Sequence, residues 1–263
     1  MRTTTKHLLW RARNRVMGGK PVVIEAGGFA PILLHPAGQI AEAFWGGDFE
    51  PVERDFLLRA IRPGMNVVNI GANIGIYAIL ASRLAGPAGH VLAFEPSSQS
   101  CERLHRNLAL NHCVNVTVEQ IALGDSSGTI LLRDDPGGGN RDALRFVERV
   151  AADGPAASAG ERVRCTSLDA YRAGSRAPID FMLVDVEGAE LDVMRGARAA
   201  IDTSPDLVML MECTDRIEDM AALTQEMGLH PFRWDMTSQS LVPCAVHPGN
   251  LVFRRAPEGA PPT

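Results

Sequence analysis

The fold is decided by the stretch Val67-Val68-Asn69-Ile70-Gly71-Ala72-Asn73-Ile74-Gly75, an apolar strand that runs into a glycine turn. Gly71 lets the chain turn sharply, and Gly75 lets backbone and ligand approach closely. A dinucleotide-binding turn follows G-x-G-x-x-G, but Asn73 and Ile76 stand at its second and third glycine positions. The turn therefore favours a nucleotide-type ligand without a pyrophosphate. A plain strand-to-helix turn is the alternative.

The next predicted strand, residues 90–94, ends at Glu95, which stands 24 residues beyond Gly71. An acid roughly 20 residues past a glycine turn can accept hydrogen bonds from both hydroxyls of a ribose. A charge that stabilises the N-terminus of the following helix is the alternative for Glu95. Turn and acid together favour an adenosyl ligand, and S-adenosylmethionine is one that lacks a pyrophosphate.

Strands and helices alternate from Met65 onwards, which is typical of right-handed β-α-β units and a parallel sheet. The apolar periodicity predicts strands at 66–70, 90–94, 114–118, 179–184 and 207–211, and helices at 74–84, 97–111, 189–200 and 215–227. Residues 121–123 and 129–132 predict a hairpin around 125–128. Residues 230–234 and 250–253 predict a terminal hairpin with one antiparallel strand. The expected fold is α/β and Rossmann-like, with a seven-stranded, mostly parallel sheet and helices on both faces.

The chain is predicted to have an accessory region, 1–60, followed by a ligand-binding domain, 61–255. Within that domain, residues 134–160 predict either a lid or a disordered loop, and 256–263 predict a disordered tail. A helix is predicted over 51–61. The first 20 residues contain cations but no acid, so they predict a basic amphipathic helix with a transit peptide as the alternative. Its apolar face is formed by Leu8, Leu9, Ala12 and Val16.

Composition narrows the class of protein. The net charge of -5 argues against a nucleic-acid binder, and no apolar run is long enough to span a membrane. The five cysteines are scattered without a C-x-x-C pair, which predicts a reducing, cytoplasmic location. We expect no nucleic-acid or membrane partner. A homodimer, paired through the N-terminal helix, is the expected oligomer.

Acidic residues follow two apolar strands of the predicted sheet. Asp185 and Glu187 come directly after the strand at 179–184, and Glu212 ends the next strand. Ligands of open α/β sheets bind beyond the carboxyl ends of the strands, so these acids are expected to reach one cleft. Burying an acid there without a partner is costly, which favours a functional role. Glu190 is expected to complement a helix dipole instead.

The chain resembles the FkbM family of methyltransferases. The resemblance spans roughly residues 48–255 and is carried by Gly71 to Gly75, Phe94-Glu95-Pro96, Asn107 with Asn111, Ala122-Leu123-Gly124-Asp125, Thr166-Ser167-Leu168-Asp169 and Asp185-Val186-Glu187-Gly188-Ala189-Glu190. It implies a class I methyltransferase fold and transfer of a methyl group from S-adenosylmethionine to a hydroxyl of a sugar or secondary metabolite. The family usually has Asp where this chain has Asn69, and that Asp helps to hold the methionine amino group. The resemblance therefore implies a weaker or altered contact here.

These observations define the predicted site. The cofactor-binding residues are expected to be Asn69, Gly71, Ala72, Asn73, Gly75, Glu95, Pro96, Ser97, Ile121, Ala122 and Asp185. Asp185, Glu187 and Glu212 are the candidate catalytic bases, and Asp185 with Glu212 would be the ligands if the reaction uses Mg²⁺. Phe44, Trp45 and Phe49, together with Glu50, are predicted either to wall the acceptor pocket or to pack the N-terminal region on the core.

Two other functions remain open. An NAD(P)-dependent oxidoreductase is disfavoured by Asn73 and Ile76 and by the lack of a Tyr-x-x-x-Lys pair. A non-catalytic adenosyl-ligand-binding module is disfavoured by the acids at the strand ends.

Overall fold

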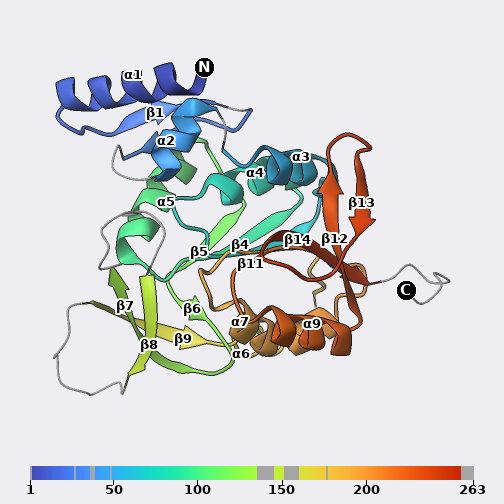
Figure 1. Ribbon diagram of the computed structural model, residues 1–263. Coiled ribbons are helices and arrows are strands. Elements are labelled where there is room, and N and C mark those ends of the chain that lie inside the picture. The colour runs from blue at the N-terminus through green and yellow to red at the C-terminus, as the bar shows by residue number, and fades with distance from the viewer. Residues whose placement is uncertain are drawn as a thin grey trace.

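A computed structural model describes residues 2–26, 28–35, 39–47, 49–134, 145–150, 160–175 and 177–255 (Figure 1). The helices are α1 (Arg2–Val16), α2 (Gln39–Gly46), α3 (Pro51–Ala60), α4 (Ile76–Ala85), α5 (Ser98–Leu110), α6 (Leu168–Tyr171), α7 (Glu190–Gly196), α8 (Arg198–Asp202) and α9 (Ile217–Glu226). The strands are β1 (Val22–Ile24), β2 (Ile32–Leu34), β3 (Asn66–Ile70), β4 (His90–Phe94), β5 (Val116–Glu119), β6 (Ala122–Leu123), β7 (Gly128–Asp134), β8 (Arg145–Val150), β9 (Glu161–Thr166), β10 (Phe181–Val184), β11 (Val208–Cys213), β12 (Leu229–Asp235), β13 (Ser240–Pro243) and β14 (Gly249–Arg255).

The central sheet has eight strands in the order β13-β12-β14-β11-β10-β3-β4-β5. Strands β11, β10, β3, β4 and β5 pair in parallel, and β14 pairs antiparallel with both β11 and β12. The predicted seven strands with one antiparallel member are therefore present. The eighth strand, β13, adds to the edge by forming a hairpin with β12.

Two hydrophobic cores cover the two faces of this sheet. Successive residues of a strand point to opposite faces, so Val67 joins the core beneath α3, α4 and α5, whereas Val68 joins the core beneath α7, α8 and α9. Figure 1 shows these two helical layers above and below the sheet. The predicted helices on both faces are confirmed, except that the one at 189–200 is divided into α7 and α8 at Ala197.

A second sheet with the order β6-β9-β7-β8 corrects the predicted hairpin around 125–128. Strand β9 lies between β6 and β7, parallel to β6 and antiparallel to β7. Strands β6 and β7 are close in sequence, but both pair with β9, which comes later in the chain, rather than with each other. Within the predicted loop or lid at 134–160, Arg145–Val150 form β8. Residues 135–144 and 151–159 lie outside the described part, as does the tail 256–263.

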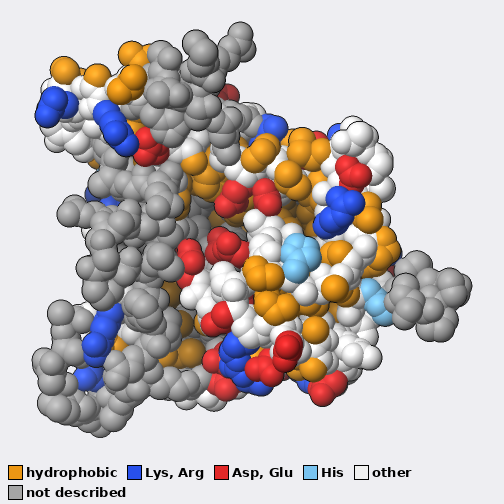
Figure 2. Space-filling model, viewed as in Figure 1, with side chains coloured by type: hydrophobic (Ala, Val, Ile, Leu, Met, Phe, Trp, Pro, Cys, Tyr) orange, Lys and Arg blue, Asp and Glu red, His pale blue; other side chains and the backbone are white. Residues whose placement is uncertain are grey.

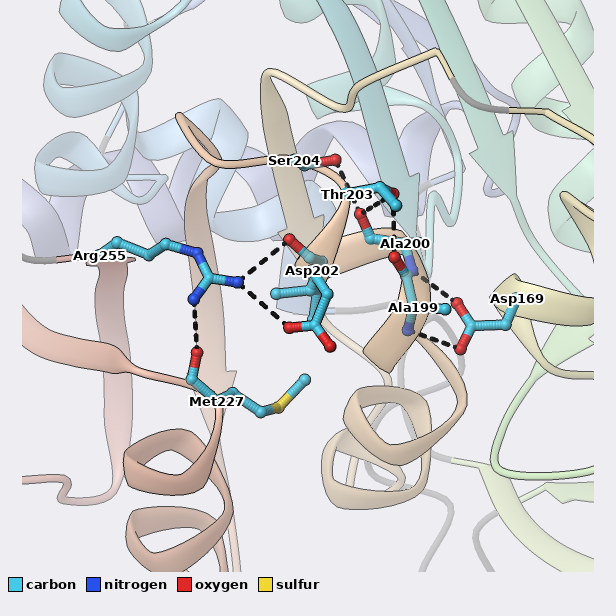
Figure 3. A network of polar contacts seen from close by, with 9 residues as sticks. Asp169, Ala199, Ala200, Asp202, Thr203, Ser204, Met227 and Arg255 are labelled. Carbon is cyan, nitrogen blue, oxygen red and sulfur yellow. Dashed lines mark hydrogen bonds and ion pairs between the residues drawn. The ribbon is translucent and has the colours of Figure 1, made fainter.

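A network of polar contacts that includes Asp169 of the Thr166-Ser167-Leu168-Asp169 motif joins the helices α8 and α9 to β14 (Figure 3). The Asp169 carboxylate accepts hydrogen bonds from the backbone N–H groups of Ala199 and Ala200, at 2.9 and 2.8 Å, and so caps the N-terminus of α8. Arg255 donates to the Met227 carbonyl and pairs with Asp202, which ties β14 to the helices below it. These contacts explain the position of Asp169 without a role in ligand binding.

The N-terminal region shares its core with the rest of the chain. The first core includes Phe29, Ile32 and Phe44 as well as residues of β3, β4 and β10. Asn107 is fully buried on α5, accepts from the Leu33 N–H at 2.7 Å and donates to the Ile74 carbonyl at 2.8 Å. A single amide therefore joins β2 to the glycine turn, so the accessory region is packed against the site.

The predicted apolar face of α1 is exposed, and the opposite side of the helix is buried. Leu8, Leu9 and Val16 are exposed, whereas Trp10 is buried against Trp45 with ring centroids 5.2 Å apart. Burial of the large indole removes more apolar surface from water than burial of the smaller aliphatic side chains would. Among the described residues, no helix combines the length and hydropathy needed to cross a bilayer.

Candidate functional site

A cavity lies beyond the carboxyl ends of β3, β4 and β10, the position at which open α/β sheets bind ligands. Nine of the predicted site residues line it: Gly71, Asn73, Glu95, Pro96, Ser97, Ile121, Ala122, Asp185 and Glu187. Asn69, Ala72, Gly75 and Glu212 are not on its wall. The parallel strands bring together acids that are more than 90 residues apart in sequence.

Glu95 holds the two loops that form one wall of the cavity. Its side chain is 7% exposed, and its two carboxylate oxygens accept backbone N–H groups of Asn73, at 2.8 Å, and Ser97, at 2.9 Å. Ser97 in turn caps α5 by accepting from the Ser100 N–H. Glu95 thus organises the glycine turn and the start of α5 at once.

Gly71 is required by the close approach of two strand ends. Its φ of +83° is in the left-handed region, and a Cβ at this position would lie 1.7 Å from the Asp185 carbonyl oxygen. The missing side chain therefore allows Asp185 to sit directly beside the turn.

Gly75 fits the turn closely against α5. Its φ of +94° is in the left-handed region, and a Cβ there would lie 2.4 Å from Leu104 Cδ1, while its predicted contact with the cofactor stays a prediction. Ala72 is buried in the first core.

Asn69 occupies a buried position near the end of β3. It is 2% exposed, and its Oδ1 has no hydrogen-bond partner among the described residues. A buried amide oxygen without a partner is costly, so its presence here is unexplained by the protein's own contacts. Its predicted contact with the cofactor stays a prediction.

The small second sheet supplies one wall of the cavity, with residues that the sequence did not predict. Four such residues line the cavity together with Glu95 and Asp185: Leu123 of β6, Ile130 and Leu132 of β7, and Cys165 of β9. The alternation of Ile130 and Leu132 marks one apolar face of a strand, which is a signal of burial. It does not say what the face covers, because that depends on how the two sheets are placed.

Three acids meet at the ends of β10 and β11. One carboxylate oxygen from each of Asp185, Glu187 and Glu212 lies within 4.8 Å of the others. Burial and the neighbouring Glu212, which is also hydrogen-bonded to it, raise the pKa of Asp185 well above its ordinary value. Burial, followed by Glu212 and Glu190, raises the pKa of Glu187 as well. Asp185 therefore takes up a proton more readily than an ordinary carboxylate, because it is buried beside other acids. Acidic side chains gather near the middle of the face shown in Figure 2.

Glu190 behaves as expected from the sequence. It lies in the first turn of α7, is 2% exposed, and accepts from the Gly188 N–H and the Thr214 hydroxyl. Its carboxylate is engaged in shaping the loop that carries Glu187.

Glu50 joins these acids from the N-terminal region. It precedes α3 with a left-handed backbone (φ 37°), and its carboxylate accepts a hydrogen bond from the Tyr77 hydroxyl. Burial, together with the nearby charges of Glu53 and Glu212, raises the pKa of Glu50 to about 7. The sequence names Glu50 as a candidate wall of the acceptor pocket, and the packing of α3 on the sheet brings it near Glu212 at the strand ends.

We expect Glu50→Gln to remove a pH-dependent loss of stability. Because the folded-state pKa of Glu50 exceeds the ordinary value of 4.5, the folded protein binds this proton more tightly than the unfolded chain. Stability from this group is present at low pH and is lost as the pH rises from 4.5 to about 7, by at most roughly 3 kcal/mol. The melting temperature of the Gln variant should therefore exceed that of the parent at pH 8 and match it at pH 4.5. Glu218→Gln, an exposed site, is the control, and equal pH profiles for all three proteins would contradict the expectation.

The aromatic residues before α3 pack on the core. Phe44 is 1% exposed and contacts Phe29 and Phe49, and Trp45 packs on Trp10. Phe49 also approaches Tyr77, with ring centroids 6.3 Å apart. The packing interpretation is therefore favoured for Phe44 and Trp45, while Phe49 lies beside the Tyr77–Glu50 contact.

Comparison with known proteins agrees with this geometry. The chain is 33% identical to "Methyltransferase sdnD" of Sordaria araneosa over 154 residues, which cover 49% of this chain and 59% of that protein. It is 28% identical to "Methyltransferase 1" of Beauveria bassiana over 143 residues, 49% of this chain and 57% of that protein. The chain thus spans less than two thirds of the length of these relatives.

The fold is found in a solved structure as well. The "SAM Dependent Methyltransferase" of Agrobacterium tumefaciens matches with a TM-score of 0.50 and 13% identity, over 91% of this chain and 71% of that one. A model of the FkbM methyltransferase domain matches residues 69–233, which include the glycine turn, Glu95 and the acids of β10 and β11. The chain therefore belongs to the FkbM methyltransferase family.

Proposed function

We propose that the protein is an S-adenosylmethionine-dependent O-methyltransferase that acts on a hydroxyl of a small molecule, a sugar or a secondary metabolite. The observation that carries the proposal is the cluster of acids Asp185, Glu187 and Glu212, whose Asp185 member lines the cavity beside the glycine turn. A hydroxyl acceptor must lose a proton as it is methylated, and a carboxylate of raised pKa is a suitable acceptor for it.

The residues on the cavity wall fit the adenosyl ligand. Glu95 stands on the cavity wall, where its carboxylate would accept from the two ribose hydroxyls, and Phe94, Ile121 and Leu132 offer apolar surface for a base. When bound, S-adenosylmethionine supplies a methyl group that is already activated by a positively charged sulfur. The acids Asp185 and Glu187 would stabilise that charge, since opposite charges attract strongly in a partly buried site.

The protein's own contribution to the reaction is alignment and proton transfer. Holding an acceptor oxygen in line with the methyl group can supply roughly 7–11 kcal/mol of the barrier. Asp185 takes the acceptor proton, and Glu212 raises its basicity by placing a second carboxylate next to it. Glu187, which is exposed at the same cluster, is the alternative base.

Two measurements test the proposal. Parallel calorimetric titrations should show binding of S-adenosylmethionine and none of NAD, and binding of NAD alone would favour an oxidoreductase. Incubation with methyl-labelled S-adenosylmethionine and an extract of the source organism should label a small molecule at oxygen. Binding without any transfer would favour the non-catalytic module.

Glu95→Gln should weaken cofactor binding by about tenfold or more, because hydrogen bonds to a charged group contribute about 1.5–3 kcal/mol. The amide keeps the size of the side chain, but it has one acceptor oxygen where Glu95 uses two. The dissociation constant for S-adenosylmethionine is the measurement. Glu102→Gln, which changes an exposed acid of α5 paired with Arg106, is the matched control and should bind as the parent does. Equal affinity of the Glu95 variant would remove this residue from the site.

Magnesium assistance is the alternative way to activate the acceptor. The acids Asp185, Glu187 and Glu212 lie close enough to offer oxygen ligands to one ion. The pKa values of Asp185 and Glu187 are raised by burial and by the neighbouring acids, so protons compete with a cation for these carboxylates, which favours the metal-free route. We therefore expect undiminished transfer after treatment with a chelator and removal of divalent ions. Loss of activity that returns on addition of Mg²⁺ would show the opposite.

A further inference from the structure

The outer face of α1 is apolar and has no protein partner among the described residues. Leu8 is 62% exposed, Leu9 is 58% exposed and Val16 is 82% exposed. With Ala12 they form one stripe, because positions that differ by three or four residues lie on the same side of a helix. The opposite side carries Trp10, which is 3% exposed and fixes the rotation of the helix.

Cations flank this stripe. Arg11 and Arg15 are exposed on α1 next to the apolar stripe, and Lys20 is exposed just beyond the helix. Arg13 is engaged differently, since it lies over the Trp10 ring and donates to Asn14. The first acid of the chain is Glu25, so no carboxylate within α1 offsets these charges.

The apolar surface continues past the end of the helix. Met17 is 46% exposed and Val23, the outward residue of β1, is 49% exposed. Figure 1 shows β1 running beside α1 at one corner of the molecule, and Figure 2 shows apolar and basic side chains together there. We define the α1 face as the residues Leu8, Leu9, Arg11, Ala12, Arg15, Val16 and Met17.

We propose that the α1 face binds the surface of an anionic membrane, with α1 lying parallel to the bilayer. A helix with an apolar stripe bordered by cations inserts its apolar side chains at the boundary of headgroups and acyl chains while the cations meet anionic headgroups. The sequence predicts no membrane partner because no apolar run is long enough to span a bilayer. The outward stripe changes that expectation for peripheral binding.

The charges of the α1 face favour a membrane over a second copy of the chain as its partner. Two α1 faces packed on one another would bring Arg11 and Arg15 of one copy close to the same cations of the other, without an acid of α1 to separate them. Like charges at an apolar contact oppose association. An anionic lipid surface complements both the apolar stripe and the arginines.

Vesicle sedimentation with the full chain tests the proposal. Vesicles of phosphatidylcholine with phosphatidylglycerol should pellet the protein, and vesicles of phosphatidylcholine alone should bind it about tenfold less tightly or weaker. Added salt should weaken binding to the anionic vesicles. The double variant Leu9→Glu with Val16→Glu should reduce binding about tenfold or more, since both apolar contacts become repulsive.

The control is Val114→Glu, which places the same charge at a site that is 90% exposed in the loop between α5 and β5. It should bind vesicles as the parent does, and all variants should keep the parent's melting temperature because the changed side chains are exposed. Arg11→Glu with Arg15→Glu should abolish the preference for anionic vesicles. Unchanged vesicle binding by the Leu9/Val16 variant would overturn the proposal. It would also be overturned if the parent ignores vesicles and forms a dimer that this variant dissociates.

Discussion

Asp185→Asn is expected to lower the rate of methyl transfer by about 10²–10⁴-fold, the usual contribution of a positioned base, while the protein stays folded. The amide has nearly the same shape but cannot accept the acceptor's proton. Because the charge of Asp185 is held beside Glu212 at a cost, its removal should not destabilise the protein. A folded, cofactor-binding and nearly inactive variant is thus the expected result.

Turnover and cofactor affinity should be measured on the same preparation. Asp206→Asn, an exposed acid away from the cluster, is the matched control and should retain full activity. A companion variant, Glu212→Gln, removes the neighbouring carboxylate that raises the pKa of Asp185. The Glu212→Gln variant should therefore stay active at a lower pH than the parent does, as measured by the rate of methyl transfer across a pH series. An Asp185 variant with the parent's rate would transfer the base assignment to Glu187.

Gly71→Ala is expected to destabilise the protein and abolish cofactor binding. The added Cβ would lie 1.7 Å from the Asp185 carbonyl oxygen, a backbone atom that cannot move without shifting β10. Gly64 provides a matched control, because its φ of +88° is similar but nothing lies within 4 Å of its Cβ position. Gly64→Ala should cost about 1–2 kcal/mol from left-handed strain alone. Gly71→Ala should cost about 3 kcal/mol more, because it adds a steric overlap to the same strain.

Denaturant unfolding of both glycine variants, followed by calorimetric titration with S-adenosylmethionine, separates the two causes. Binding by the Gly64 variant should equal that of the parent. If the two variants lose equal stability, the close approach of the turn to Asp185 is not the constraint on Gly71.

The sequence alone determines most of the main sheet. The strand Asn66–Ile70 and the helix α5 are found where the sequence predicts them, because apolar periodicity acts between neighbours in the chain. The positions of Glu95 and Asp185 in one cavity also follow from sequence, since parallel strands bring their carboxyl ends to one edge. These features rest on short-range patterns together with one rule of topology.

Only the tertiary structure decides the remaining parts of the site. The sequence predicts Gly75 from its place in the turn, but only the fold shows that Leu104 of α5 packs beside it. Glu50 reaches the acids of β10 and β11 only because α3 packs across the sheet, and β9 separates β6 from β7 although these are closer in sequence.

The glycine turn can therefore be predicted from the sequence, whereas the side chains that pack around it cannot. A strand or helix is encoded by the order of its own residues. The choice of which face is buried depends on the surfaces that distant segments offer, as α1 shows by burying Trp10 and exposing its aliphatic stripe. Side chains that meet through such packing, including Glu50 and the wall formed by Ile130 and Leu132, have no local signature because their neighbours are brought to them by the fold.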